Sequence, residues 1–165
     1  MESRSVESIF RALNEAKVRY LVVGGLAVVA HGYARMTADI DLVIGLERDN
    51  ILKGLGALHD VGYRMAVPVT PAQFADADQR ERWQREKGML VLKMWSDVHR
   101  RTPIDIFVYE PFDMDEEWQR AWRVNWADDL TVPVVSVETL LKMKRSAGRP
   151  QDLADIAALQ DRQNI

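Results

Sequence analysis

The sequence predicts an α/β (α+β) fold in which helices flank a small mixed β-sheet. Segments with helical periodicity alternate along the chain with short β-rich runs. The 165 residues are 47% hydrophobic and 28% charged, which is ordinary for a globular protein and long enough for one core. We therefore expect a single domain over residues 1–165, with its core in about 5–110 and a C-terminal helical part in about 136–162.

Composition excludes several classes of protein. The formal charge is −3 and the isoelectric point about 5.6, so the whole surface does not suit a polyanion. Cysteine is absent, which excludes disulfides, thiolate zinc sites and cysteine nucleophiles. The first 20 residues carry charges throughout, and the longest apolar run, 20–30, is too short to cross a membrane. We expect a cytoplasmic protein without a membrane partner.

The first half of the chain predicts two strands among three helices. Val6, Ile9, Phe10 and Leu13 recur at helical spacing, which predicts a helix over residues 5–17. The following elements are expected as strand 20–23, helix 26–31, strand 39–44 and helix 50–59.

The second half predicts further strands and a helical end. One charged helix is expected over 72–87, ending at Gly88, and Ser136 and Gly148 are expected to cap a helix over 137–147. Strand 132–135 is expected at a sheet edge if Pro133 belongs to it. The other expected elements are strands 89–95 and 104–109, a short acidic helix in 111–121 and a last helix over 151–160.

Two aspartates stand where a strand should be apolar. Asp39 and Asp41 alternate with Ile40 and Leu42, so their carboxylates should project side by side from one face of strand 39–44. Like charges at this spacing repel, and a divalent cation is the simplest group to offset the repulsion. The alternative is a solvent-exposed aspartate pair, or one that is bound to arginine.

A third carboxylate and a glycine pair favour the metal site. Asp105 lies inside the apolar run 103–108, and if the two strands are neighbours three carboxylates converge. Such a group can hold two ions, as in enzymes of in-line phosphoryl transfer. Gly24 and Gly25, between a strand and a helix, let backbone N–H groups approach a phosphate. A tight turn is the alternative interpretation of the glycines.

Together these residues resemble the nucleotidyltransferase superfamily, whose fold is shared with DNA polymerase beta. The signature is Val23-Gly24-Gly25, 13 intervening residues, and Asp39-Ile40-Asp41-Leu42, with Asp105 on a later strand. The stretch GGLAVVAHGYARMTADIDLVI and the tail VSVETLLKMKRSAGRPQDLADIAAL are similar to small bacterial stand-alone members. These include the abortive-infection and type IV toxin group and the minimal nucleotidyltransferases. The resemblance covers about 20–45 and 100–160, and residues of about 60–90 take no part in it.

The resemblance implies roles for these residues. Asp39 and Asp41 would bind two Mg²⁺ ions, with Mn²⁺ as an alternative, and the phosphates of an NTP. Asp105 would complete the metal site and help to deprotonate an acceptor hydroxyl, while Gly24 and Gly25 would hold the triphosphate. The implied activity is transfer of a nucleoside monophosphate from an NTP to RNA, protein or a small molecule, in a toxin–antitoxin or phage-defence setting. A cognate antitoxin would be the partner protein.

Three further residues are candidate phosphate contacts, each with a structural alternative. Arg35 and Thr37 lie between the glycine pair and the aspartates, where a solvated loop is the other interpretation. Lys144 belongs to a basic segment for which a solvated helix face is the alternative interpretation. The resemblance favours Lys144 as a site residue.

Trp118, Trp122 and Trp126 are spaced four apart in an acidic stretch. Packing in the core or against a partner fits them better than base stacking, and the acidic surface would suit a basic partner. Two rival functions remain for the whole chain. One is a catalytically silent protein that binds a nucleotide or a partner, and the other is a metal-dependent phosphohydrolase.

Overall fold

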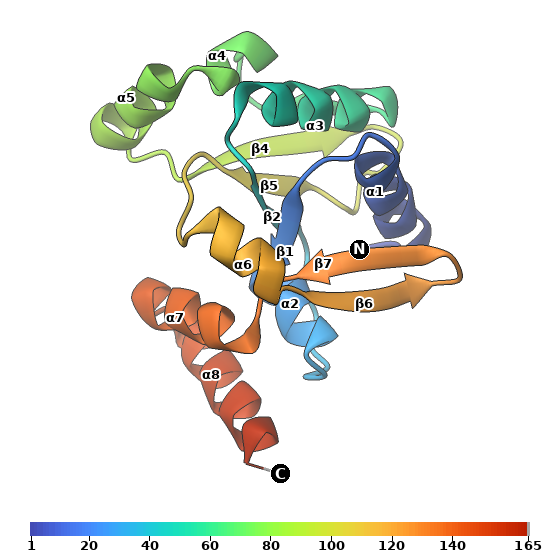
Figure 1. Cartoon of the computed structure of the whole chain (residues 1–165), viewed down its shortest axis with the longest axis vertical. Helices are drawn as coiled ribbons and strands as arrows, with labels where there is room; N and C mark the ends of the chain where they lie inside the picture. The colour runs from blue at the N-terminus through green and yellow to red at the C-terminus, as the bar shows by residue number, and fades with distance from the viewer. Residues whose placement is uncertain (165) are drawn as a thin grey trace.

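The computed structural model describes residues 1–164 and contains a seven-stranded mixed sheet with helices around it (Figure 1). The strand order is β3-β4-β5-β2-β1-β7-β6. The strands are β1 Tyr20–Val23, β2 Ile40–Ile44, β3 Tyr63–Met65, β4 Val91–Ser96, β5 Ile104–Phe107, β6 Trp122–Ala127 and β7 Leu130–Val134. The helices are α1 Ser3–Glu15, α2 Gly24–Ala30, α3 Arg48–Asp60, α4 Pro71–Ala75, α5 Ala77–Lys87, α6 Met114–Arg120, α7 Val137–Ala147 and α8 Pro150–Gln163.

The centre of the sheet fixes the register of the residues that matter for function. β2 pairs with β5 in parallel, and Asp41 lies directly beside Asp105. On its other side β2 pairs antiparallel with β1, so that Val23 lies beside Asp41. Because Gly24 follows Val23, the glycine turn at the start of α2 is brought against the aspartate strand.

One face of the sheet is covered by α1 and α3. Side chains alternate between the faces of a strand, and Tyr20, Leu42 and Ile106 are fully buried on the same side of their strands. Phe10 of α1 stacks on Tyr20 with ring centroids 5.9 Å apart. The aspartates of β2 and β5 therefore project from the opposite face.

Local sequence explains several of the helix ends, as predicted. The Ser136 hydroxyl accepts a hydrogen bond from the Thr139 N–H at the start of α7, and Gly148 ends that helix in the left-handed conformation. Gly88 ends α5 in the same way. Pro150 begins α8, where its missing N–H costs nothing.

The single helix predicted over 72–87 is wrong, because the chain breaks at Asp76. That residue is extended, and its carboxylate accepts hydrogen bonds from the N–H groups of Asp78 and Gln79, which starts α5 anew. The first piece, α4, begins at Thr70 with a capping box to Gln73.

The expected edge position of the strand that contains Pro133 is also wrong. β7 lies between β1 and β6, and β6 forms the edge. Backbone N–H groups alternate sides along a strand, and the Val135 N–H donates to the Val22 carbonyl of β1. Pro133, two residues earlier, therefore lacks its donor on the β1 side, where pairing is restricted to Val22 and Val134.

Two strands were missed from the sequence, β3 and β6. With only three residues, β3 is too short to show a period. β6 takes two of the three tryptophans that are spaced four apart, while Trp118 stays on α6. Trp126 packs edge-on against Phe10, as expected of core packing, and Trp122 stacks on His31.

Over residues 1–164, none of the helices combines the length and the apolar character that a membrane crossing requires.

Candidate functional site

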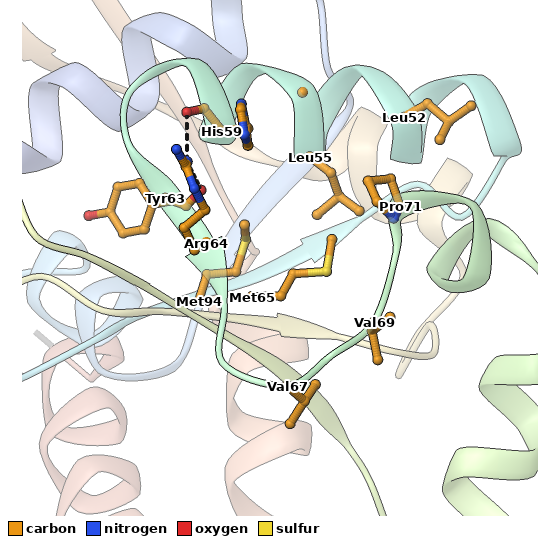
Figure 2. Close-up of a pocket in the computed structure, with 11 residues that line it drawn as sticks. Leu52, Leu55, His59, Tyr63, Arg64, Met65, Val67, Val69, Pro71 and Met94 are labelled. Atoms are coloured by element: carbon orange, nitrogen blue, oxygen red, sulfur yellow. Dashed lines mark hydrogen bonds between the residues drawn. The ribbon is translucent and has the colours of Figure 1, made fainter.

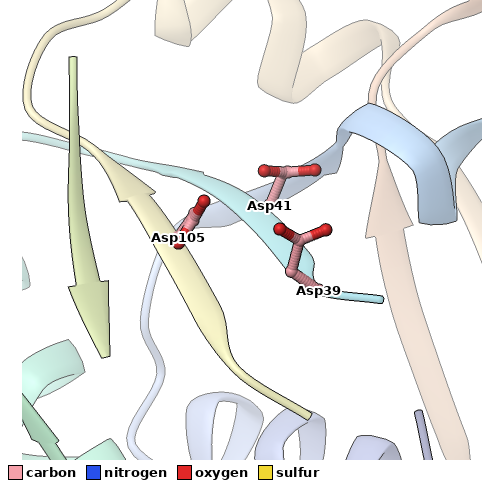
Figure 3. A group of neighbouring side chains, drawn as sticks. All are labelled: Asp39, Asp41 and Asp105. Atoms are coloured by element: carbon pink, nitrogen blue, oxygen red, sulfur yellow. The ribbon is translucent and has the colours of Figure 1, made fainter. Parts of the chain in front are cut away.

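Asp39, Asp41 and Asp105 come together at the sheet centre (Figure 3). Each offers a carboxylate oxygen, and these oxygens lie within 4.8 Å of one another. Asp39 immediately precedes β2, Asp41 is its second residue, and Asp105 is on the neighbouring β5. Carboxylate oxygens are the hard ligands that Mg²⁺ or Mn²⁺ prefers. The three carboxylates, called here the acidic triad, therefore supply the ligand type of the metal site that the sequence predicts.

Position 24 requires glycine, because the Asp41 carboxylate leaves no room for a side chain there. Its φ angle is +64°, in the left-handed region that favours glycine. A Cβ atom placed on Gly24 would lie 2.0 Å from Asp41 Oδ2. A side chain there would displace the carboxylate, so the backbone turn and the triad occupy one continuous surface.

Gly25 brings the loop after α2 into the same site. A Cβ atom on Gly25 would lie 2.5 Å from Thr37 Oγ1 and 2.7 Å from Arg35 Nη2. The Gly25 N–H also donates to the carboxylate of Asp41. The predicted phosphate residues Gly24, Gly25, Arg35 and Thr37 are thus gathered beside the triad.

The electrostatics of the triad favour the arrival of positive charge. Burial, together with the nearby carboxylates of Asp39 and Asp105, raises the pKa of Asp41 from 3.8 to about 6. The positive charge of Lys144 and the hydrogen bond from Gly25 lower that pKa but do not outweigh these effects. A bound cation would relieve the same repulsion.

Lys93 is a site residue that the sequence did not reveal. It lies opposite Asp105 in the antiparallel pairing of β4 and β5. Its ammonium donates to both carboxylate oxygens, at 2.9 and 3.0 Å. The hydrogen bond to Asp105 raises the pKa of Lys93, so it stays charged. Only the pairing of the two strands identifies this lysine, and no sequence pattern marked it.

Lys144 lies in a buried ion-pair cluster. Its side chain is 5% exposed, and its ammonium contacts Asp152 Oδ1 at 2.9 Å and Asp155 Oδ2 at 2.8 Å. Arg35 Nε lies 3.0 Å from Asp155 Oδ1, and Arg149 Nε donates to Asp152 Oδ2 at 2.8 Å. Burial alone would raise the pKa of Asp152, but hydrogen bonds from Arg149 and Lys144 hold it at about 2.

This cluster changes the interpretation of two predicted phosphate contacts. Lys144 is enclosed between carboxylates and Arg35 is bound to Asp155, so both tie α7 and α8 to the loop that carries Thr37. We assign them a positioning role. The aspartates of the cluster were missed, although their spacing of three residues on the last helix was a signal that they share a face.

The pocket drawn in Figure 2 lies on the other face of the sheet and takes no part in the acidic site. It has a volume of about 370 Å³ and lies between α3, β3, β4 and the loop before α4, with Met65 and Met94 at its floor. Met94 and Lys93 are consecutive on β4, and their side chains therefore project to opposite faces.

A protein-family model matches residues 9–165 under the description "Nucleotidyl transferase AbiEii toxin, Type IV TA system". The chain belongs to this family. The AbiEii-family chain is a nucleotidyltransferase, as its sequence motif predicted. A search of curated proteins gave no significant match.

Solved structures of nucleotidyltransferases share the fold of this AbiEii-family protein. The lincosamide antibiotic adenylyltransferase LnuA, bound to lincomycin, is 19% identical with a TM-score of 0.64, covering 97% of each chain. A putative nucleotidyltransferase from Thermotoga maritima is 14% identical with a TM-score of 0.58, covering 96% of this chain and 92% of the other. ANT(2″)-Ia, in complex with adenylyl-2″-tobramycin, is 14% identical with a TM-score of 0.56, covering 98% of each chain.

Proposed function

We propose that the protein transfers a nucleoside monophosphate from an NTP to a hydroxyl acceptor in an Mg²⁺-dependent reaction. The observation that carries the proposal is the acidic triad, which lies against the Gly24–Gly25 turn. Asp39, Asp41 and Asp105 would hold two Mg²⁺ ions, or Mn²⁺ in their place. Bound ions of this kind stabilise charge on the attacking and leaving oxygens of an in-line displacement.

The chain's own residues supply the rest of the chemistry. Because Gly24 and Gly25 carry no side chains of their own, a triphosphate would approach the backbone at the start of α2. Thr37, which lies beside Gly25, would contact the same phosphates. Asp105 would accept the proton of the attacking hydroxyl, while Lys93, whose ammonium donates to both of its carboxylate oxygens, would hold that carboxylate in place.

The acceptor and the biological setting belong to the proposal. RNA, protein and small molecules were all expected as acceptors. Lincomycin in the similar LnuA structure and adenylyl-2″-tobramycin in that of ANT(2″)-Ia favour a small molecule. The family description supports a type IV toxin–antitoxin setting with an antitoxin partner. A cytoplasmic location and a single domain stay predictions from the sequence.

A transfer assay with site variants tests this function. Wild type, Asp39→Asn and Asp105→Asn are incubated with each α-labelled NTP, Mg²⁺, and RNA, protein or small-molecule acceptors. Of these three proteins, we expect only wild type to label an acceptor. Asp60→Asn is the matched control, since Asp60 has an 85% exposed side chain outside the triad. Binding of nucleotide without labelling would support a silent scaffold, and NTP consumption without labelling would support a phosphohydrolase.

A further inference from the structure

One half of the sheet presents an aromatic side chain to solvent beside the triad. Along β4, buried Leu92, Met94 and Ser96 alternate with exposed residues on the opposite face. The exposed side includes Trp95, of which 46% is accessible. A single exposed aromatic side chain is ordinary on a protein surface, and what distinguishes Trp95 is its place on the sheet face that carries the triad.

The exposed side of β4 is continuous with the acidic triad. Lys93 is paired with Asp105 in register, so both project from the same face, and Trp95 is two residues further along that face. Two residues along a strand span about 7 Å, and Lys93 Nζ is 2.9 Å from Asp105 Oδ1. The Cα atom of Trp95 therefore lies about 7 Å along the strand from that of Lys93, on the face that carries the Lys93–Asp105 pair.

The charges on this surface discriminate between classes of acceptor. β3, β4 and β5 carry two cations, and both are engaged. Lys93 is held by Asp105, and Arg64 donates to the backbone carbonyls of Tyr63 and His59 at 2.9 and 3.4 Å. With three carboxylates beside it, this strand surface offers few of the basic contacts that a phosphodiester chain needs, and the exposed Arg100 and Arg101 lie in the turn beyond β4. The strand surface suits a neutral or cationic ring compound.

We propose that Trp95 is the platform for the acceptor, and that the acceptor is a small hydroxylated ring compound of glycoside type. This inference rests on the proposed function, because it names the acceptor for the same site. The apolar face of the ring would pack on the indole, with a hydroxyl directed to the triad. That oxygen forms a bond to the α-phosphorus of the NTP, the bond to the β-phosphate oxygen breaks, pyrophosphate leaves, and the proton passes to Asp105.

Direct binding tests the platform without requiring turnover. The full chain with Mg²⁺ and a non-hydrolysable ATP analogue is titrated by calorimetry with neamine, with methyl α-maltoside and with a short oligouridylate. We expect wild type to bind a glycoside probe, and Trp95→Ala to weaken that binding about tenfold or more, by analogy with lost ring stacking. Trp95→Phe should retain most of the affinity, and binding of the ATP analogue should be unchanged in both variants.

Trp122 provides a matched control, because it is also 46% exposed but lies on β6 at the far edge of the sheet. Trp122→Ala should bind the probes as wild type does. The proposal is overturned if wild type binds neither glycoside, if it binds the oligouridylate alone, or if Trp95→Ala binds the glycoside as tightly as wild type. Since binding and labelling are measured separately, loss of the platform is distinguishable from failure of the transfer reaction.

Discussion

Gly24 and the carboxylate of Asp41 are in such close contact that a side chain at position 24 would displace the carboxylate. The positive φ angle of Gly24 turns the chain from β1 into α2, and the missing Cβ leaves room for Asp41 Oδ2. A substitution here combines two separate penalties, one for the backbone conformation and one for the displaced carboxylate. Gly88 isolates the first of them, because its φ angle is +59° and nothing lies within 4 Å of the position of a Cβ.

We expect Gly24→Ala to abolish transfer, whereas Gly88→Ala retains it. Both variants should lose roughly 1–2 kcal/mol of stability from the left-handed backbone. Gly24→Ala alone displaces a triad ligand. Urea unfolding and label transfer are measured for both proteins. Equal activity in the two variants would show that the contact between Gly24 and Asp41 does not matter for the chemistry.

Replacing Asp41 should change the free energy of unfolding by an amount that depends on pH. Because folding raises its pKa from 3.8 to about 6, the folded state binds more protons in that window and loses stability as the pH rises through it. In the absence of divalent ions, Asp41→Asn should therefore be more stable than wild type at pH 7.5, by at most roughly 3 kcal/mol. The gain should vanish near pH 4.

The check is urea unfolding of wild type and Asp41→Asn at both pH values in EDTA. A stability difference that is the same at pH 4 and pH 7.5 would contradict the electrostatic origin of the effect.

At the scale of elements, the buried ion pairs join three segments that meet beside the site. Asp155 of α8 is bound by Lys144 of α7 and by Arg35 of the loop that follows α2. Asp155 is fully buried, so removing Lys144 takes away one of the two cations that its carboxylate contacts. The cluster thereby holds the loop with Thr37 against the glycine turn.

Lys144→Met should lower the free energy of unfolding by about 3–5 kcal/mol, as expected for breaking a buried ion pair. Lys142→Met, two residues earlier on the exposed side of α7, should change it by no more than about 0.5 kcal/mol. Thermal and urea unfolding of the two variants check this. Similar stability in both would mean that the cluster contributes little to the fold.

Elements with strong local signals were predictable and those governed by tertiary pairing were not. The periodicity of α1, the Ser136 cap and Gly148 each act within one turn of the chain. Edge strands β3 and β6 have no comparable local signal, because they exist through pairing with β4 and β7. The Asp76 break was readable in principle as an N-cap, but the charged sequence around it also fits one continuous helix.

At the scale of the whole molecule, the site is assembled from segments distant in sequence. The aspartate strand and Asp105 were predictable because aspartate is disfavoured inside a strand. The glycine turn was predictable because two glycines stand between a strand and a helix. Lys93 was not, since an exposed strand lysine is ordinary and only the β4–β5 register brings it to Asp105. The acidic triad can therefore be predicted from the sequence motif, whereas Lys93 is identified only from the pairing of the strands.

Metal binding should stabilise the whole molecule through the triad. A ligand that binds only the folded state adds about 2.7 kcal/mol at a hundredfold excess over its dissociation constant. We expect Mn²⁺ with a non-hydrolysable ATP analogue to raise the melting temperature of wild type and of Asp60→Asn. The melting temperature of Asp39→Asn should not respond. An equal response in all three proteins would place the ion elsewhere.

The central claim is that the triad directs transfer of a nucleotidyl group, and following two labels in parallel reactions tests it most directly. Wild type is incubated with Mg²⁺, the acceptor set and an NTP labelled on the α-phosphate in one reaction and on the γ-phosphate in the other. We predict that the α label becomes attached to an acceptor, the γ label appears in pyrophosphate, and the two products form in equal amounts. A γ label released as orthophosphate, or an α label that remains in free nucleotide and is never attached to an acceptor, would contradict the claim.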